Sequence, residues 1–412
     1  MQIKKSFVPI ALGIVLLLFG AAHSKFIWWK AASKVGPDPL LSISVGDSLH
    51  IWASGIPQLV THTTDGGVTW SLRPPPPNSY SVDFIDFIDS LRGWGAGPAG
   101  GSDGSILRTT DGGQSWAVQV SLTGMSMRGI EFMDSFYGVA IGGGEPGLYA
   151  LFTSNGGLNW RQSFYPLSTV SIHALKVLDT NHVWVGGNNF FDPNGDTSVA
   201  FFSSDWGRTW QAQAPHEQFS LWYVIAIDFL DTINGYLLAQ YGNGAEHHLY
   251  RTSDGGASWS RILELSAFSN WVLNDMDAVD TLDIWMAGHL FQGDNIAGFL
   301  HSSDVGAAWD TILTETYGSF QDLEMHSSHQ GWAVGWEGLL YVYLEIILGD
   351  LNLDKEVTTA DVVLELMKVF SDQAFPAPPE TGDVNCDGTF TPSDVVLILI
   401  RTFLEEPFPC SI

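Results

Sequence analysis

The stretch "RTSDGGASW", Arg251 to Trp259, joins a tight-turn signal to a large aromatic residue. The second glycine of its pair recurs in every related stretch, so we expect that position to have a positive φ, which glycine adopts without steric cost. The Asp or Asn two residues earlier can cap the turn through its side-chain oxygen. The five related stretches, 44 to 50 residues apart, are "TTDGGVTW" (63–70), "TTDGGQSW" (109–116), "TSNGGLNW" (153–160), "SSDWGRTW" (203–210) and "SSDVGAAW" (302–309).

A second pattern repeats in step with the first. It consists of an apolar strand, an Asp-Ser or Asp-Thr turn, and a strand that usually contains tryptophan. Together the two patterns describe four strands in roughly 45 to 50 residues, which is typical of one blade of a β-propeller. The seven occurrences begin at Asp47, Asp89, Asp134, Asp179, Asp231, Asp280 and Ser327.

The last unit stops at "GWAVGWEGLLYVY" without its Asp-Gly turn or fourth strand. Near the N-terminus, "FIWWKAAS" places Trp29 ahead of a strand much as Trp70 precedes the strand after it. Pairing the two ends would remove exposed sheet edges and close the ring. We therefore predict a mainly β chain in which residues 25–346 form a seven-bladed propeller of four-stranded blades, closed by the N-terminal strand.

The first 24 residues read as a cleavable secretory signal. Lys4 and Lys5 precede an apolar run from Phe7 to Ala22, and small residues follow near Ser24. An uncleaved anchor is the alternative, although the run is short for a membrane span. We expect a secreted or cell-surface protein with no membrane span after cleavage.

The chain has 17 Lys and Arg against 45 Asp and Glu, a formal net charge of -28. Nucleic acids and anionic membranes would repel such a protein, so neither is an expected partner.

The repeated Ser/Thr-x-Asp-x-Gly-x-x-Trp pattern resembles the Asp box, or bacterial neuraminidase repeat. The strands "GWGAG" (93–97) and "GWAVG" (331–335) are similar to those of the photosystem II assembly factor family, and sortilin-like receptors have comparable propellers. The resemblance covers about residues 25–346. It implies that the six Asp boxes are structural turns, away from the active face.

Long loops of unequal length lie on the face opposite the Asp-Gly turns, and binding sites concentrate in such loops. Aromatic residues there either line a funnel for sugar rings or peptide side chains, or cap the core at the blade ends. These residues are Tyr80, Phe190, Phe191, Trp222, Tyr241, Trp271, Phe291 and Trp336. We predict no catalytic residues, because no pair of carboxylates and no arginine cluster stands out.

The C-terminal segments "GDLNLDKEVTTAD" and "GDVNCDGTFTPSD" place oxygen donors at the spacing of EF-hand-like calcium loops. We expect two Ca²⁺ ions, each followed by a helix; the alternative is an acidic helical hairpin without calcium. The expected ligands are Asp350, Asn352, Asp354, Thr358 and Asp361 in the first loop and Asp383, Asn385, Asp387, Thr391 and Asp394 in the second.

These two loops resemble a type I dockerin over residues 349–412, apart from Lys355 in place of the usual glycine and a long connection between the halves. The resemblance implies attachment to a cohesin-like partner of polysaccharide-degrading complexes. Export also makes a disulfide between Cys386 and Cys410 possible.

Two functions fit these features. The first is a secreted, noncatalytic docking protein whose propeller binds an extracellular glycan or protein. The second is a polysaccharide-degrading glycoside hydrolase tethered through its tail, since dockerins usually accompany such catalysts and xyloglucanases use Asp-box propellers. Xyloglucanases, however, resemble two propellers in tandem, and this chain has one.

Overall fold

The computed structural model describes residues 24–31, 36–77, 80–100, 103–144, 147–165, 170–189, 200–213, 222–241, 246–264, 270–291, 293–353, 355–371, 377–378, 381–404 and 408–409. Residues 1–23 of the expected signal (1–24) lie outside this set, and its last residue, Ser24, begins a β-strand. The chain divides into two units, residues 26–345 and residues 346–412 with 1–25, and each is treated by itself. No helix within the described ranges is long and apolar enough to cross a membrane.

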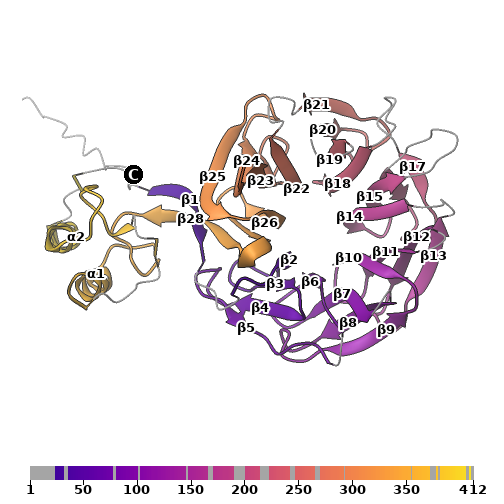
Figure 1. Ribbon diagram of the computed structural model, residues 1–412, viewed down its shortest axis with the longest axis horizontal. Helices are drawn as coiled ribbons and strands as arrows, with labels where there is room; N and C mark the ends of the chain where they lie inside the picture. The colour runs from indigo at the N-terminus through magenta and orange to yellow at the C-terminus, as the bar shows by residue number, and fades with distance from the viewer. Residues whose placement is uncertain are drawn as a thin grey trace, which may run out of the picture. The chain divides into compact units, whose positions relative to one another are not determined.

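The first unit consists of seven antiparallel four-stranded sheets arranged around a common centre, as Figure 1 shows. The first strand of each sheet lies nearest the centre. The predicted propeller fold is therefore confirmed. Blades 1 to 3 are β2 (Leu40–Val45), β3 (Ile51–Gly55), β4 (Leu59–Thr63), β5 (Ser71–Leu72); β6 (Phe84–Phe87), β7 (Gly93–Gly100), β8 (Asp103–Thr109), β9 (Ala117–Leu122); and β10 (Ser126–Phe132), β11 (Gly138–Gly144), β12 (Gly147–Thr153), β13 (Arg161–Tyr165).

Blades 4 to 6 follow the same order. They are β14 (Val170–Asp179), β15 (His182–Asn189), β16 (Ala200–Ser203), β17 (Gln211–Gln213); β18 (Trp222–Phe229), β19 (Gly235–Tyr241), β20 (Glu246–Thr252), β21 (Ser260–Glu264); and β22 (Trp271–Ala278), β23 (Ile284–Phe291), β24 (Asn295–Ser302), β25 (Asp310–Tyr317).

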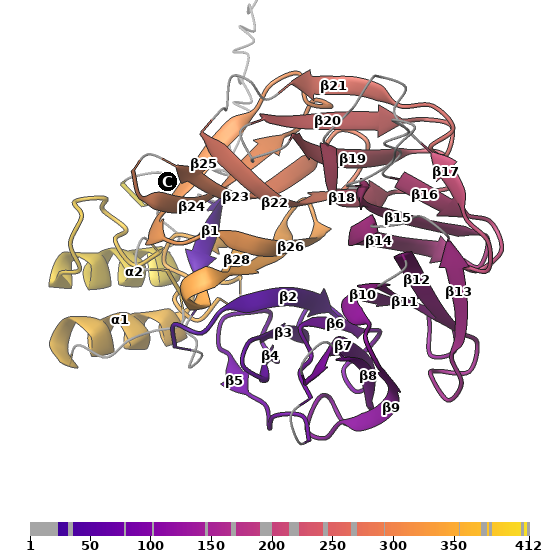
Figure 2. The ribbon, with the colours of Figure 1, turned by 45° about the vertical axis from the view of Figure 1, so that its right-hand side comes forward.

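The seventh blade joins both ends of the propeller. Its strands are β26 (Phe320–Ser327), β27 (Gln330–Gly335), β28 (Leu340–Ile347) and, outermost, β1 (Ser24–Lys30). Figures 1 and 2 both show β1 beside β28, as the sequence predicts. The Trp28 ring stacks on Phe299 with centroids 4.0 Å apart, which anchors β1 to the sixth blade.

The Asp-Gly turns have one repeated geometry. In the first, Thr63 Oγ1 accepts a hydrogen bond from Gly67 N at 3.0 Å, and Asp65 Oδ1 accepts one from Thr69 N at 2.9 Å. All six second glycines have a positive φ, as predicted. The preceding position is also left-handed, even where Trp206 (φ 63) and Val305 (φ 65) replace glycine.

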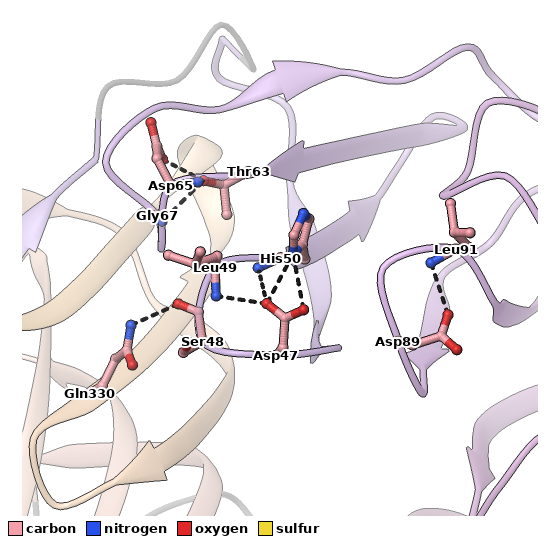
Figure 3. Close-up of polar contacts among 10 residues, drawn as sticks. All are labelled: Asp47, Ser48, Leu49, His50, Thr63, Asp65, Gly67, Asp89, Leu91 and Gln330. Carbon is pink, nitrogen blue, oxygen red and sulfur yellow. Dashed lines mark hydrogen bonds and ion pairs between the residues drawn. The ribbon is translucent and has the colours of Figure 1, made fainter.

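Neighbouring blades are joined by the tryptophans of the second strands. Trp52 Nε1 donates to Gly112 O of the next blade's Asp-Gly turn at 3.1 Å, and Trp332 Nε1 donates to Gly66 O at 2.9 Å. The second of these bonds crosses the junction between the last blade and the first. Gln330 Nε2 adds a 3.0 Å bond to Ser48 O at the same junction, shown in Figure 3. The closing junction therefore repeats the chemistry found elsewhere in the ring.

The second unit contains helices α1 (Thr359–Ser371) and α2 (Pro392–Leu404). Its core is formed by Leu348, Leu351, Val362, Val384, Val395, Ile398 and Phe408. Cys386 is in a disulfide, but Cys410 lies outside the described residues, so their pairing stays a prediction.

Candidate functional site

A polar pocket of about 380 Å³ opens between the sixth and seventh blades, on the face opposite the Asp-Gly turns. Trp336 and Tyr317 line it, and their side chains are 43% and 58% exposed. Phe291, 56% exposed, is paired in the sheet with the lining residue Asn295. Two exposed aromatic residues therefore line the pocket, and a third, Phe291, lies on the strand beside it. The prediction included Phe291 and Trp336 but missed Tyr317, which sits at the end of a fourth strand outside the loops that were considered.

A network of side chains holds the floor of this pocket. Ser319 Oγ lies 2.8 Å from His289 Nδ1 and accepts a 2.8 Å hydrogen bond from Asn274 Nδ2. Burial lowers the pKa of His289, so its ring is neutral at pH 7. The floor is therefore uncharged and offers amide and imidazole groups for hydrogen bonding.

The rim is shaped by the short 3₁₀ helix η2 (Trp336–Gly338). Trp336 N donates to Ser319 O at 3.0 Å, which ties η2 to the start of β26. Glu337 has a left-handed backbone (φ 62) and adds the one carboxylate among the lining residues that the structure describes. The aromatic ring of Trp336 is thus held by backbone contacts beside a single negative charge.

Among the other predicted funnel residues whose side chains the structure describes, Tyr80 and Trp271 do not line this pocket. Trp271 is 3% exposed and packs in a hydrophobic cluster, so it caps the core. Tyr80 packs partly buried in another cluster, and its hydroxyl lies 3.3 Å from Ser121 Oγ. Trp222 and Tyr241 are opposite each other in the β18–β19 pair. Phe190 and Phe191 lie outside the described residues.

The first strands also enclose a central cavity of about 340 Å³ with charged walls. Each blade contributes one residue from the same repeat position, opposite the large residue of the second strand. In blades 2 to 7 that residue is ionisable, and in the first blade it is a serine. We call these seven the ring residues: Ser44, Asp86, Glu131, Lys176, Asp228, Asp277 and Glu324.

Each ring residue contacts the next blade. Glu131 Oε2 accepts a 2.9 Å hydrogen bond from Val177 N, and Glu324 Oε2 closes the circle by accepting from Val45 N at 3.1 Å. Ser44, Asp86, Asp228 and Asp277 accept equivalent backbone N–H bonds from Phe87, Phe132, Ala278 and Met325. The junction between blades 4 and 5 instead has an ion pair from Lys176 to Asp228. All seven junctions are thereby joined at one level.

The cavity holds these carboxylates in a low-dielectric setting. Burial raises the pKa of Asp86 to about 7 and that of Glu131 to about 8. Burial also acts on Asp228, but the Lys176 charge outweighs it and lowers the pKa of that carboxyl. Since every ring residue is already bonded to a neighbouring blade, we assign the ring to blade assembly.

This ring of residues was not predicted, although the repeats contain the pattern that indicates it. The ring residue always stands three positions before the first residue of the Asp-Ser or Asp-Thr pattern, as Asp86 stands before Asp89 and Glu324 before Ser327. A polar residue at a fixed place on an inner strand indicates a channel-facing contact.

The two predicted calcium loops of the helical unit have matching backbones. Leu353 and Lys355 are left-handed in the first loop, as are Cys386 and Gly388 at the same positions of the second. In both loops the last predicted ligand caps its own loop. Asp361 accepts hydrogen bonds from Asn352 N and Thr358 N, and Asp394 accepts them from the matching Asn385 N and Thr391 N.

Two oxygen atoms of the expected calcium ligands converge in the second loop. Asp383 Oδ1 and Asn385 Oδ1 accept hydrogen bonds from Asp387 N at 3.0 and 2.8 Å. Asp354 of the first loop is outside the described residues. In the part of the chain that the structure describes, no group of three or more His, Cys, Asp and Glu is arranged to hold a metal ion.

Comparison with known proteins places the propeller among familiar folds. No family model matches the chain. A photosystem II assembly lipoprotein, Ycf48 of Synechococcus sp. (strain CC9902), is 33% identical over 91 residues, which are 21% of this chain and 26% of that protein. The matched part thus spans about a quarter of the curated relative.

Solved structures share the fold at low sequence identity. YCF48 bound to a D1 peptide superposes with a TM-score of 0.58 at 19% identity, over 77% of this chain and 96% of that one. The GH74 enzyme of Niastella koreensis gives a TM-score of 0.59 at 14% identity, over 76% of this chain and 53% of that one. The chain contains a seven-bladed propeller that resembles Ycf48.

Proposed function

We propose that this protein is a noncatalytic docking protein whose propeller binds an extended segment of another protein. The observation that carries the proposal is the pair of exposed aromatic residues, Tyr317 and Trp336, that line the pocket between blades 6 and 7, with exposed Phe291 on the neighbouring strand. Open aromatic rings of this size mark interaction surfaces on soluble proteins.

The polar groups of the pocket suit a polypeptide backbone. Asn274, Asn295 and Gln321 present amides that both donate and accept hydrogen bonds. The solved structure of YCF48 with a D1 peptide supports the proposal by precedent, since its propeller has the same fold.

A glycoside hydrolase is less well supported at this place. Such enzymes use two carboxyl groups on either side of the scissile bond, and Glu337 is the one carboxylate among the described lining residues. The carboxylates of the central cavity are engaged in bonds between blades. The likeness to GH74 enzymes supports a shared fold, which by itself carries no activity.

Binding to a peptide library and to a polysaccharide panel tests the proposal. Trp336→Ala should abolish or strongly weaken peptide binding. Phe136→Ala is the matched control, because Phe136 is 59% exposed but lies in an Asp-Ser turn on the opposite face. Binding of glycans alone would contradict the peptide proposal, and release of reducing ends from a polysaccharide would support the hydrolase.

We further propose that the C-terminal unit binds two Ca²⁺ ions and attaches the protein to a cohesin-like partner outside the cell. The donors are hard oxygens, which suit Ca²⁺. The matched left-handed positions let each loop wrap back on itself. The buried carboxyl group of Glu365, whose oxygens have no hydrogen-bond partner in the described part of the chain, lies against Gly382 at the start of the second loop. When bound, Ca²⁺ would supply positive charge among the loop carboxylates.

Calcium titration of the full chain tests this second proposal. Adding Ca²⁺ should increase helical circular dichroism, and Asp350→Ala or Asp383→Ala should each remove one binding event. The 17 tryptophans all lie between Trp28 and Trp336, so tryptophan fluorescence follows the propeller and should respond little to a chelator. Identical helical signals with and without calcium would contradict the proposal.

A further inference from the structure

Glu365 is a buried carboxylate in the core of the helical unit. It lies in the middle of α1, its side chain is 0% exposed, and neither Oε1 nor Oε2 has a hydrogen-bond partner among the described residues. An ionised carboxylate in such a place is strongly destabilising unless a positive charge or donors reach it. The structure therefore contains a buried carboxyl group whose two oxygens have no partner among the described residues.

The internal repeat of the unit makes this residue stand out. The two loops begin at Asp350 and Asp383, and the helices begin at Thr359 and Pro392, so matching residues are 33 positions apart. The counterpart of Glu365 is Ile398, which is also 0% exposed and belongs to the hydrophobic core. The fold therefore accepts an apolar side chain at this position, and the first helix has a carboxylate there instead.

The Glu365 carboxylate lies against the start of the second loop. A Cβ atom placed on Gly382, immediately before Asp383, would come within 2.8 Å of Glu365 Oε2. The Asp394 and Asp383 carboxylates, the last and first ligands expected in that loop, act on Glu365 electrostatically. Thr381 Oγ1, also buried without a partner among the described residues, adds a fourth oxygen-bearing side chain to this region.

The negative charges of Asp383 and Asp394 disfavour an ionised Glu365, and an apolar surrounding strengthens that effect. A divalent cation reverses it, because one ion compensates several of the charges at once. The unpartnered oxygens of Glu365 thus point to the same kind of ligand as the loop itself.

We propose that Glu365 belongs to the second cation site, so that the first helix donates a carboxylate across the unit to the ion of the second loop. This inference rests on the proposed calcium loops. It adds that the second site has a ligand from the other half of the unit and that the first site has none. Filling the second loop compensates a charge on α1 and locks the two helices together. Filling the first loop has no such effect, because the equivalent position of α2 is the apolar Ile398.

Calorimetric calcium titration of the full chain separates the two loops when one of them is disabled. In the Asp350→Ala background, Glu365→Gln should weaken the remaining calcium affinity by about 10- to 100-fold. In the Asp383→Ala background, the same change should leave the affinity unaltered. Glu345→Gln removes the same charge from β28 and is the matched control. Glu365→Ile copies Ile398 and tests the inference again with a side chain that the core accepts.

A second measurement concerns the calcium-free protein. With a chelator present, Glu365→Gln and Glu365→Ile should raise the temperature at which helical circular dichroism is lost, since each removes the unpaired buried charge. If wild type binds calcium but Glu365→Gln matches Glu345→Gln in both backgrounds, this inference is overturned and the calcium loops stand. If wild type binds no calcium, both are overturned.

Discussion

Lys176 Nζ lies 2.6 Å from Asp228 Oδ1, and this ion pair joins the fourth and fifth blades inside the central cavity. Lys176 is the one base among the seven ring residues. Burial alone would lower its pKa, but the charges of Asp228 and Glu131 outweigh burial and raise it, so the ammonium stays charged. The Lys176 cation therefore compensates the buried Asp228 carboxylate of the next blade.

Replacing this lysine should destabilise the propeller severely. Lys176→Met leaves Asp228 buried without its counter-charge, and we expect a loss of about 3 to 5 kcal/mol in the free energy of unfolding. Arg92→Gln, which breaks the exposed Arg92–Asp89 pair, should cost less than about 1 kcal/mol. Urea unfolding followed by tryptophan fluorescence measures both, and equal losses would contradict the special role of Lys176.

The propeller should become less stable as the pH rises from about 5 to about 8, between the unfolded and the folded pKa values of its buried carboxyl groups. Glu131, with a pKa raised to about 8, and Asp86, with one raised to about 7, hold protons in the folded state that the unfolded chain has already released. Each such group lowers stability by up to about 1.4 kcal/mol per pH unit until the pH passes its folded pKa. Melting temperatures across this range would show the slope.

Glu131→Gln should flatten that pH dependence, because the amide oxygen can still accept from Val177 N while the titrating group is gone. A slope unchanged by this substitution would show that the loss of stability arises elsewhere.

Two substitutions at left-handed turn positions should have opposite effects on the stability of the propeller. Val305→Gly should stabilise the propeller by about 1 kcal/mol, because a β-branched residue is strained at φ 65. Trp206→Gly at the equivalent position should destabilise it. Trp206 is 3% exposed, and its Nε1 donates to Thr153 O at 3.1 Å. Thermal unfolding of both variants compares them directly, and a shift in the same direction for both would contradict this account.

Deleting residues 25–35 should destabilise the whole propeller, because β28 would become an exposed edge and Phe299 would lose its stacking partner Trp28. The measurement is the midpoint of tryptophan fluorescence on heating. A truncated protein that melts like the intact one would show that β1 contributes little.

The blades and their closure were predictable because the repeat itself carries them. Gly67 and its counterparts indicate turns, Trp52 and its counterparts indicate second strands, and Trp29 indicates the outer strand of the last blade. Repetition averages out the ambiguity of any single segment. The strand β1, which is far in sequence from the other strands of the seventh blade, could therefore be assigned to that blade.

The candidate site was predictable only in part, since it depends on departures from the repeat. Trp271 and Trp336 are both aromatic residues on the same face, but one packs in the core while the other is exposed on η2. That difference comes from packing with other blades, which a local pattern does not contain. Glu365 escaped notice for a related reason: its significance appears only when α1 is superposed on α2.

The contacts of the ring residues all run in one rotational sense, from each blade to its successor. Six of the seven are bonds from the successor's backbone N–H, including the one at the junction between blades 7 and 1, and the contact between blades 4 and 5 is the Lys176–Asp228 ion pair. The covalent connection between consecutive blades is therefore not what determines which blades pack against each other. A circular permutant that links residue 26 to residue 345 and opens between two other blades should assemble the same propeller, with the old junction covalently closed and a new, equally well-bonded one in its place.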